Sequence, residues 1–300
     1  MRLPKDGPIM VVGRSGQVAT ALARSGNPRI RCVGRPDLDF DRPETVTAAM
    51  EAINPVMVVN AAAWTAVDAA EDHVEAATRA NRDGPALLAR LCAQRDIPLV
   101  HISTDYVFDG RKGSPYVESD PTCPRTVYGR TKREGEEAVL AAHARAIILR
   151  TAWVYSAHGK NFVKTMLNAG EKHPTLRVVG DQHGNPTSAT DLADAILKIV
   201  ACLESRDWSE DMAGIYHAAG TGDATWHELA RVTLHEAARH GRPMPEILSI
   251  TTADWPTPAE RPADSRLACD RLSTVFGIRL PEWRQSVART VTEILGPTVS

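Results

Sequence analysis

The chain has few cysteines for its 300 residues, and they are not clustered. The five are scattered without a CxxC spacing: Cys32, Cys92, Cys123, Cys202 and Cys269. A disulfide framework or a zinc site would need closer grouping. The pattern predicts reduced, mostly buried thiols, and we expect the cytoplasm as the compartment.

Long apolar runs and a large net charge are also missing. No run approaches the roughly 20 apolar residues that span a bilayer, and the N-terminus shows no apolar region typical of a signal peptide. A formal net charge of −2 gives no long-range attraction to nucleic acid or to an anionic membrane. The ten histidines show no metal-ligand spacing. We therefore expect no nucleic-acid partner, no membrane contact and no required metal.

What the chain does contain is the composition of a globular enzyme, with 43% hydrophobic and 24% charged residues. Its length predicts one large and one small domain. In the first half, short β-branched runs alternate with helical patterns. Strands are predicted at 9–12, 30–33, 56–59, 99–102 and 147–149, and helices at about 17–25, 45–53, 75–95 and 126–142.

This alternation predicts an α/β fold with a Rossmann-type doubly wound parallel sheet, covered by helices on both faces. Two further strand candidates, at 176–179 and 215–218, would extend or flank that sheet. After about residue 153 the regularity fades. Helices predicted near 161–169, 191–203, 226–240 and 283–295 suit a smaller, mainly helical lobe that closes over a ligand.

A glycine-rich turn follows the first predicted strand and opens a helix. Its residues are Gly13, Arg14, Ser15, Gly16, Gln17 and Val18. In this context glycines let the backbone approach a pyrophosphate, and the helix N-terminus offers amides and a positive dipole. We predict that Gly13, Ser15, Gly16, Gln17 and Val18 bind a dinucleotide. A simple tight turn is the alternative.

The end of the second strand distinguishes the two nicotinamide cofactors. NAD-preferring sites carry an acid there, whereas this chain has Arg35, which can pair with a 2′-phosphate. We therefore predict NADPH, with NADH left open as a second accepted cofactor. Asp39 and Phe40 are expected to flank the adenine, and capping of the second helix by residues 37–41 is the alternative.

Small residues follow the third strand. Ala61, Ala62, Ala63 and Thr65 would let a cofactor lie against the backbone, so we place the nicotinamide half there. Plain core packing of the alanines is the alternative.

Tyr128 and Lys132 are four residues apart on a predicted helix, so their side chains share one face. An ammonium beside a phenol favours the phenolate and lowers its pKa. Tyr128 would give its proton to a ketone oxygen, Thr104 would hydrogen-bond to that oxygen, and Lys132 would hold the nicotinamide ribose. Together with the glycine turn, this predicts carbonyl–alcohol redox chemistry; an ordinary solvated helix pair is the alternative.

Neighbouring residues narrow the reaction. No glutamate follows Asp105, so the paired acids wanted for water elimination are incomplete. No cysteine lies near Thr104 to serve as a base of a two-base epimerisation. With elimination and epimerisation disfavoured, simple reduction of a carbonyl group is the predicted reaction.

In order along the chain, these motifs resemble the dTDP-4-dehydrorhamnose reductase family of the extended short-chain dehydrogenase/reductase superfamily. The resemblance covers nearly the whole chain. Its marks lie at 13–18, 60–68, 103–108, 127–132, 150–155, 161–167, 181–187 and 261–267.

The resemblance implies reduction of dTDP-4-dehydro-6-deoxy-L-mannose by NAD(P)H to dTDP-L-rhamnose. It places the catalytic residues on Thr104, Tyr128 and Lys132, which also contact substrate or cofactor. It places a sugar-contacting aromatic on Trp153, with a core aromatic as the alternative. The same pocket would be lined by Val67 and Tyr106.

Arg261 is a candidate for the nucleotide diphosphate, because its fork of donors suits phosphate oxygens; a surface salt bridge is the alternative. Two other functions stay open: reduction of another 4-keto-deoxysugar nucleotide, and a non-catalytic cofactor-binding regulatory subunit. A homodimer is also left open. We expect residues 1–154 and 174–218 to form the NADP(H)-binding domain, and residues 155–173 and 219–300 the sugar-nucleotide lobe.

Overall fold

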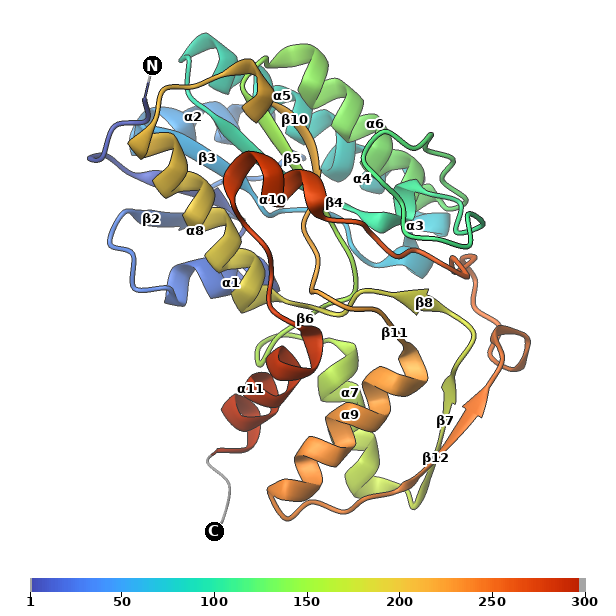
Figure 1. Cartoon of the computed structure of the whole chain (residues 1–300). Helices are drawn as coiled ribbons and strands as arrows, with labels where there is room; N and C mark the ends of the chain where they lie inside the picture. Colours follow the sequence, from blue (N-terminus) through green and yellow to red (C-terminus); the bar gives the residue numbers. More distant parts are fainter. Residues whose placement is uncertain (1, 297–300) are drawn as a thin grey trace.

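A six-stranded parallel sheet forms the centre of the larger part of the molecule (Figure 1). The computed structural model describes residues 2–296. In spatial order the strands are β10 (Gly214–His217), β5 (Ala146–Thr151), β4 (Leu99–Thr104), β3 (Met57–Asn60), β1 (Ile9–Val12) and β2 (Ile30–Val33). All neighbours in this sheet pair in parallel. The predicted Rossmann-type doubly wound sheet is confirmed, including β10.

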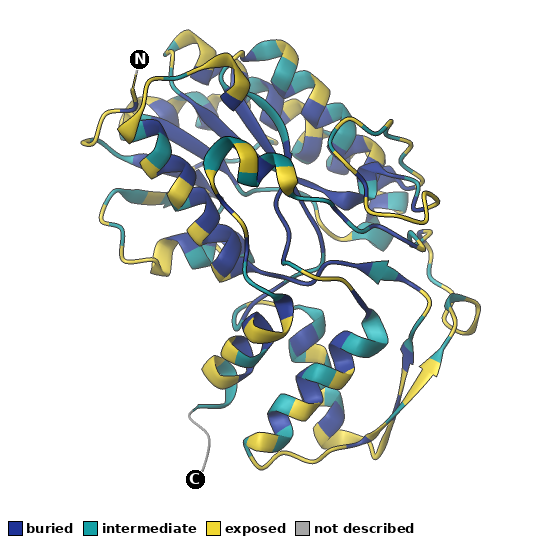
Figure 2. Ribbon diagram, viewed as in Figure 1, coloured by how far each residue is buried: buried dark blue, intermediate teal, exposed yellow. Residues whose placement is uncertain are grey.

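Helices cover both faces of the sheet, because both faces of its strands are apolar. In β1, Ile9 and Val11 point to one core, and Met10 and Val12 point to the other. The first core is closed by α1 (Gln17–Arg24) and α8 (Ala189–Ser205), and the second by α2 (Pro43–Ile53), α5 (Gly84–Gln94) and α6 (Val127–Ala142). Figure 2 shows the strands as the most buried layer.

The strand order reverses at β1, which has β2 on one side and β3 on the other. In open α/β sheets a ligand binds at such a switch point, outside the carboxyl ends of the strands. A ligand site is therefore expected at the residues that follow β1 and β3.

The predicted helix at 75–95 is helical but not continuous. It comprises α4 (Val74–Thr78), a π-helical turn (Arg79–Asp83) and α5, and it follows α3 (Val67–Asp72). Pro85 has no N–H to donate to the carbonyl of Asn81, which explains the wider turn. The backbone of Asn81 lies so close to α6 that a Cβ on Gly135 would meet its carbonyl oxygen at 2.0 Å.

A smaller group of helices stands beside the sheet (Figure 1). It consists of α7 (Phe162–Lys172), α9 (Trp226–Arg239) and α11 (Trp283–Leu295), which pack around a core that contains Trp283. The other elements are β6 (Val154–Tyr155), β7 (Thr175–Val179), β8 (His183–Gly184), β9 (Thr187–Ser188), β11 (Ala224–Thr225), β12 (Glu246–Ile250), α10 (Asp270–Phe276) and short 3-10 turns at Asp105–Val107, Glu210–Met212 and Thr252–Asp254.

Residues 176–179 do not extend the central sheet, which was one of the two alternatives predicted for them. This strand, β7, pairs with β12 in a separate two-stranded sheet next to α9. Its outward side chains Thr175 and Arg177 are exposed, whereas strands inside the central sheet are buried on both faces. Conversely, α10 packs on the central sheet, with the Arg271 guanidinium 4.5 Å from the Tyr216 ring centre. The domain boundaries given above stay a prediction.

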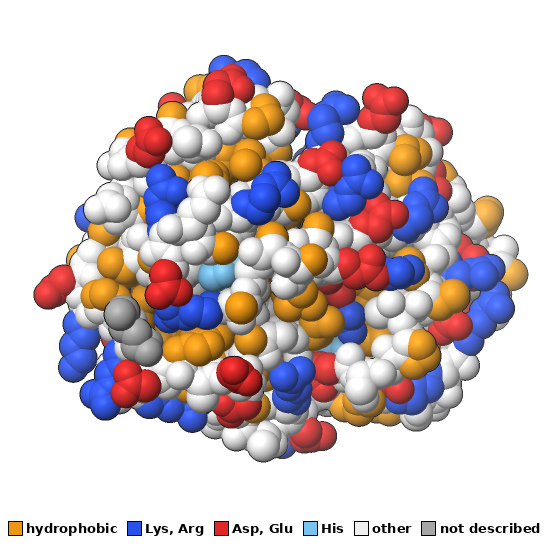
Figure 3. Space-filling model, turned by 90° about the horizontal axis from the view of Figure 1, so that it is seen from above, with side chains coloured by type: hydrophobic (Ala, Val, Ile, Leu, Met, Phe, Trp, Pro, Cys, Tyr) orange, Lys and Arg blue, Asp and Glu red, His pale blue; other side chains and the backbone are white. Residues whose placement is uncertain are grey.

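Acidic and basic side chains intermingle on the face seen in Figure 3. Within residues 2–296, no helix is both long enough and apolar enough to cross a membrane.

Candidate active site

Four of the predicted site segments meet at one edge of the central sheet. Gly13 follows β1, Ala61 follows β3, Thr104 ends β4, and Trp153 comes shortly after β5. Because these strands are parallel, their carboxyl ends lie side by side. The sheet thus places the glycine turn, the small residues and the predicted catalytic threonine along one edge.

The glycine turn is shaped for a close approach to a ligand. Gly13 has a φ of +131°, and a Cβ there would lie 3.2 Å from Cβ of Ala19 and 3.5 Å from the backbone of Ala61. Gly16 is the N-cap of α1 and supplies no side-chain partner for the first helical amides. Ser15 and Gly16 are exposed, so these amides face solvent and can receive a pyrophosphate.

The other two residues predicted in this turn have different surroundings. Val18 is buried in the core between α1 and the sheet. The side chain of Gln17 hydrogen-bonds to residues 154–161, far along the chain. Only the backbone of these two residues remains for a cofactor.

Arg35 is exposed and already paired. Its guanidinium donates to Asp39 Oδ1 at 2.9 Å and to Asp41 Oδ2 at 2.7 Å. Burial opposes a low pKa for Asp39, but hydrogen bonds from Asp41 and Arg35 hold that pKa below its usual range. Arg14 lies beside Gly34 and donates to Asp37, so two arginines flank the place expected for a 2′-phosphate.

Phe40 packs on the start of α5, where a Cβ on Gly84 would meet its ring at 2.2 Å. Its ring is therefore partly occupied by a helix contact. The alanines after β3 are only half-buried, and Thr65 is exposed. The Ala61 amide donates to the Val12 carbonyl at 2.9 Å, which joins this segment to the end of β1.

Tyr128 and Thr104 are brought together by α6 and β4, and both are buried. Burial raises the pKa of Tyr128 to about 12; a hydrogen bond with Thr104 opposes the rise, and Asp105 adds to it. The predicted lowering of this pKa by Lys132 is therefore wrong for the protein chain alone. The phenol is held protonated, as a proton donor must be before it reacts.

Lys132 is fully buried and points to β4. Its Nζ donates to the Ile102 carbonyl at 2.6 Å and lies 3.4 Å from Nε2 of His101. Burial lowers the pKa of Lys132 to about 8, and Glu136 opposes that change. The Lys132 ammonium is thus bound by a backbone carbonyl of β4.

Asp105 is a buried carboxylate next to the catalytic hydroxyl. Its Oδ1 accepts from Thr104 Oγ1 at 3.0 Å, and its Oδ2 has no partner among the described residues. Burial raises the pKa of Asp105 to about 6, and the nearby hydroxyls of Ser265 and Thr104 oppose the rise. The Thr104 hydroxyl therefore has a defined orientation.

A buried ion pair lies one helical turn beyond Lys132. Arg150 donates to Glu136 through Nε at 2.9 Å and Nη2 at 2.7 Å, and Ser103 donates to the same carboxylate at 2.5 Å. This bidentate pair joins α6 to β4 and β5. The pair thereby helps to set the position of α6, with Tyr128 and Lys132, relative to the sheet.

Val67 and Tyr106 gather around Tyr128, as the family resemblance implies. They form one apolar cluster with it, and the Tyr106 and Tyr128 rings meet edge to face at 5.5 Å. Arg261 lies on the same side, where its Nη2 donates to Asp68 Oδ2 at 2.7 Å. Arg261 is thus half-buried in a salt bridge, and a phosphate would have to share it with Asp68.

Trp153 has an unusual backbone and a flat packing surface. Its φ is +48°, which is rare for a bulky residue and is found mostly at functional sites. The indole stacks on Trp226 with ring centres 3.6 Å apart and planes 9° apart. One face of Trp153 is therefore covered by Trp226.

Sequence reasoning missed several partners of these residues. Trp226 was not expected near the site, because it comes from a distant element. His101 was given no role, yet it touches Lys132. The i, i+4 spacing of Lys132 and Glu136 is a signal that could have pointed to the buried pair.

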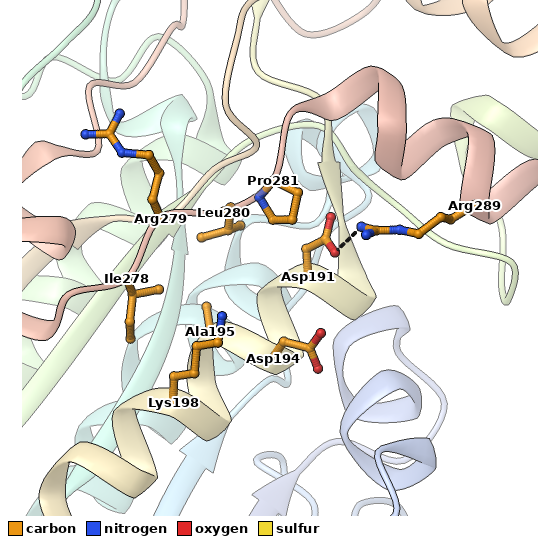
Figure 4. A pocket seen from close by; sticks show the side chains of 9 residues that line it. All are labelled: Asp191, Asp194, Ala195, Lys198, Ile278, Arg279, Leu280, Pro281 and Arg289. Carbon is orange, nitrogen blue, oxygen red and sulfur yellow. Dashed lines mark hydrogen bonds and ion pairs between the residues drawn. The ribbon is translucent and has the colours of Figure 1, made fainter.

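A separate cavity of about 80 Å³ lies between α8 and the segment before α11 (Figure 4). Asp191 and Arg289 form an ion pair of 2.5 Å there. The cavity is too small for a nucleotide sugar. In residues 2–296, no cluster of three or more His, Cys, Asp or Glu is placed to hold a metal ion.

Several known proteins are similar to this chain over nearly its whole length. The dTDP-4-dehydrorhamnose reductase of Sinorhizobium fredii is 44% identical over 289 residues, covering 96% of this chain and 97% of the relative. A probable dTDP-4,6-dihydroxy-2-methyloxan-3-one 4-ketoreductase of Streptomyces antibioticus is 40% identical, with 95% of both chains covered.

A solved dTDP-4-dehydrorhamnose reductase of Bacillus anthracis, in complex with NADP, superimposes with a TM-score of 0.89. It is 30% identical, and the match covers 96% of this chain and 99% of that chain. Residues 7–295 match the family described as RmlD substrate binding domain. The chain belongs to this family.

Proposed function

We propose that the chain reduces the 4-keto group of dTDP-4-dehydro-6-deoxy-L-mannose with NADPH and forms dTDP-L-rhamnose. The main support is that buried Tyr128 and Thr104 come together near buried Lys132, at the same sheet edge as the glycine turn. The reductases named above support the same substrate.

Each residue has a role that follows from its surroundings. Tyr128 carries a proton that burial retains, and it gives this proton to the ketone oxygen as the carbon accepts hydride. Thr104 turns its hydroxyl proton from Asp105 to the same oxygen. Lys132 then stabilises the phenolate, because a cation favours the charged form.

The turn and the segment after β3 fit a dinucleotide. The space beside Gly13 is backbone-lined, and the first amides of α1 are open to a pyrophosphate. Arg35 and Arg14 would hold a 2′-phosphate, and the alanines at 61–63 would face the nicotinamide half. When bound, NADPH supplies the hydride.

The experiment is a reductase assay with NADPH and the dTDP-4-keto-6-deoxy-L-sugar. We expect the absorbance of the reduced cofactor to fall, and to fall at least about 100-fold more slowly with Tyr128→Phe. Tyr128→Phe retains the ring and its contact with Tyr106, so it isolates the hydroxyl. Equal rates for the two proteins would refute the proposal, as would a wild type without turnover.

A second candidate is reduction of another 4-keto-deoxysugar nucleotide, favoured by the likeness to the Streptomyces ketoreductase. NMR of the product decides between the two by the configuration at C4. A non-catalytic regulatory subunit would bind NADPH but show no turnover. We further propose a cytoplasmic location, a small-molecule partner only, and activity without added metal; a homodimer stays an open prediction.

A further inference from the structure

The side chain of Gln17 hydrogen-bonds to a distant segment. Its Oε1 accepts from Asn161 Nδ2 at 3.1 Å, and its Nε2 donates to the Val154 carbonyl at 3.1 Å. Its Oε1 also lies 3.1 Å from Ser156 Oγ, whose single proton is shared with the His158 carbonyl at 2.6 Å. These partners lie 137 to 144 positions further along the chain. One amide group thus connects the first turn of α1 to the segment that follows Trp153.

That segment has hydrogen bonds of its own, which hold its residues together. Asn161 Nδ2 also donates to the Ser156 carbonyl at 2.8 Å, and Asn161 Oδ1 caps α7 by accepting from the Lys164 amide at 3.1 Å. Val154 pairs with Thr187 in the β6–β9 ladder. The hydrogen bonds of Gln17 therefore hold β6 and the first turn of α7 as one unit.

The backbone and the side chain of Gln17 belong to two different predicted binding sites. Its backbone is the first residue of α1, in the turn where the dinucleotide is proposed to bind. Its side chain holds the chain next to Trp153, which has a left-handed backbone with a φ of +48°. Ser156 is buried, so water does not readily replace the hydrogen bonds of the Gln17 side chain.

We infer that Gln17 is a positioning residue that sets the distance between the cofactor and the sugar-contacting aromatic residue predicted at position 153. The inference rests on the proposed function for the identity of the two ligands. It assigns the Gln17 side chain to the sugar-nucleotide site and leaves only its backbone to the cofactor.

Gln17→Met tests this inference, because it retains the chain length and helix propensity but loses the hydrogen bonds of the amide. We expect the KM for the dTDP-sugar to rise five- to tenfold and the KM for NADPH to stay within twofold. Gln94→Met, at an exposed position at the end of α5, is the matched control and should change neither value. Ser156→Ala removes one of these contacts and should give an intermediate rise.

Hydrogen exchange of the protein without ligands gives a second readout that needs no turnover. Amides in residues 154–164 should exchange at least tenfold faster in Gln17→Met than in wild type. If exchange is unchanged, the Gln17 side chain does not hold this segment in place, and the inference is refuted. Faster exchange with an unchanged KM for the sugar, or with an equal rise in both KM values, would overturn the positioning role. If wild type does not reduce the keto sugar, the proposed function fails, and exchange together with binding of dTDP to both proteins still decides the inference.

Discussion

Nε2 of His101 lies 3.4 Å from Nζ of Lys132, and both side chains are fully buried. The imidazole orientation follows from its other partner. Asn60 Oδ1 accepts from the Ala62 amide at 3.2 Å, so Asn60 Nδ2 donates to Nδ1 of His101 at 3.0 Å. The ring proton is then on Nε2 and faces the amine of Lys132, which favours an uncharged amine.

This arrangement predicts a pH-dependent loss of activity. Lys132 is protonated below its pKa of about 8 and neutral above it, with burial as the main cause and Glu136 as the opposing charge. We expect kcat/KM to fall as pH rises through about 8. Lys132→Arg should be slower but should lack this decline between pH 7 and 10, because guanidinium stays charged. The same decline in the variant would contradict the assignment.

Two neighbouring glutamates on α6 should differ sharply in their effect on stability. Glu136 is buried with Arg150, whereas Glu137 makes an exposed pair with Arg133. Glu136→Gln leaves a buried guanidinium without its countercharge, so we expect a loss of about 3–5 kcal/mol in the free energy of unfolding. Glu137→Gln, the matched control, should cost under about 1 kcal/mol. Urea denaturation measures both, and similar losses would show that burial does not decide the cost.

Asp105→Asn should stabilise the protein at alkaline pH. The folded pKa of about 6 lies above the ordinary 3.8, so wild type gains stability as pH falls through 6 and loses it as pH rises. At pH 8 the variant avoids a buried charge worth on the order of 2–3 kcal/mol. At pH 4 the two proteins should unfold at nearly the same temperature. An equal gain at both pH values would contradict the raised pKa.

Arg35→Ala should weaken the preference for NADPH over NADH by about 10- to 100-fold, since a charge-assisted pair with the 2′-phosphate is lost. Arg31→Ala, within β2 and bonded to backbone carbonyls of residues 28 and 30, is the control. Kinetics with both cofactors measure the ratio. An unchanged ratio would leave Arg35 as a partner of Asp39 and Asp41 only.

The sequence was sufficient to predict the sheet, because its signals are local. Runs such as 9–12 are apolar on both faces, which only a covered parallel strand requires. The four-residue spacing of Tyr128 and Lys132 likewise predicted a shared helix face, and both side chains are buried beside β4.

Features that depend on distant partners could not be predicted. β7 reads like any sheet strand, and only its partner β12, about 70 residues later, assigns it to a separate ladder. The pKa of Tyr128 was predicted in the wrong direction because spacing says nothing about burial or about the carbonyl that binds Lys132. The bonds of Gln17 to residues 154–161 have no local signature either.

The stacked indole of Trp153 leaves no room at Gly184, where a Cβ would lie 2.4 Å from the ring. Even an alanine at this position would push the tryptophan off Trp226. Positions 153 and 184 therefore cannot change one at a time. A methyl group at residue 184 would displace the indole that Trp226 now covers.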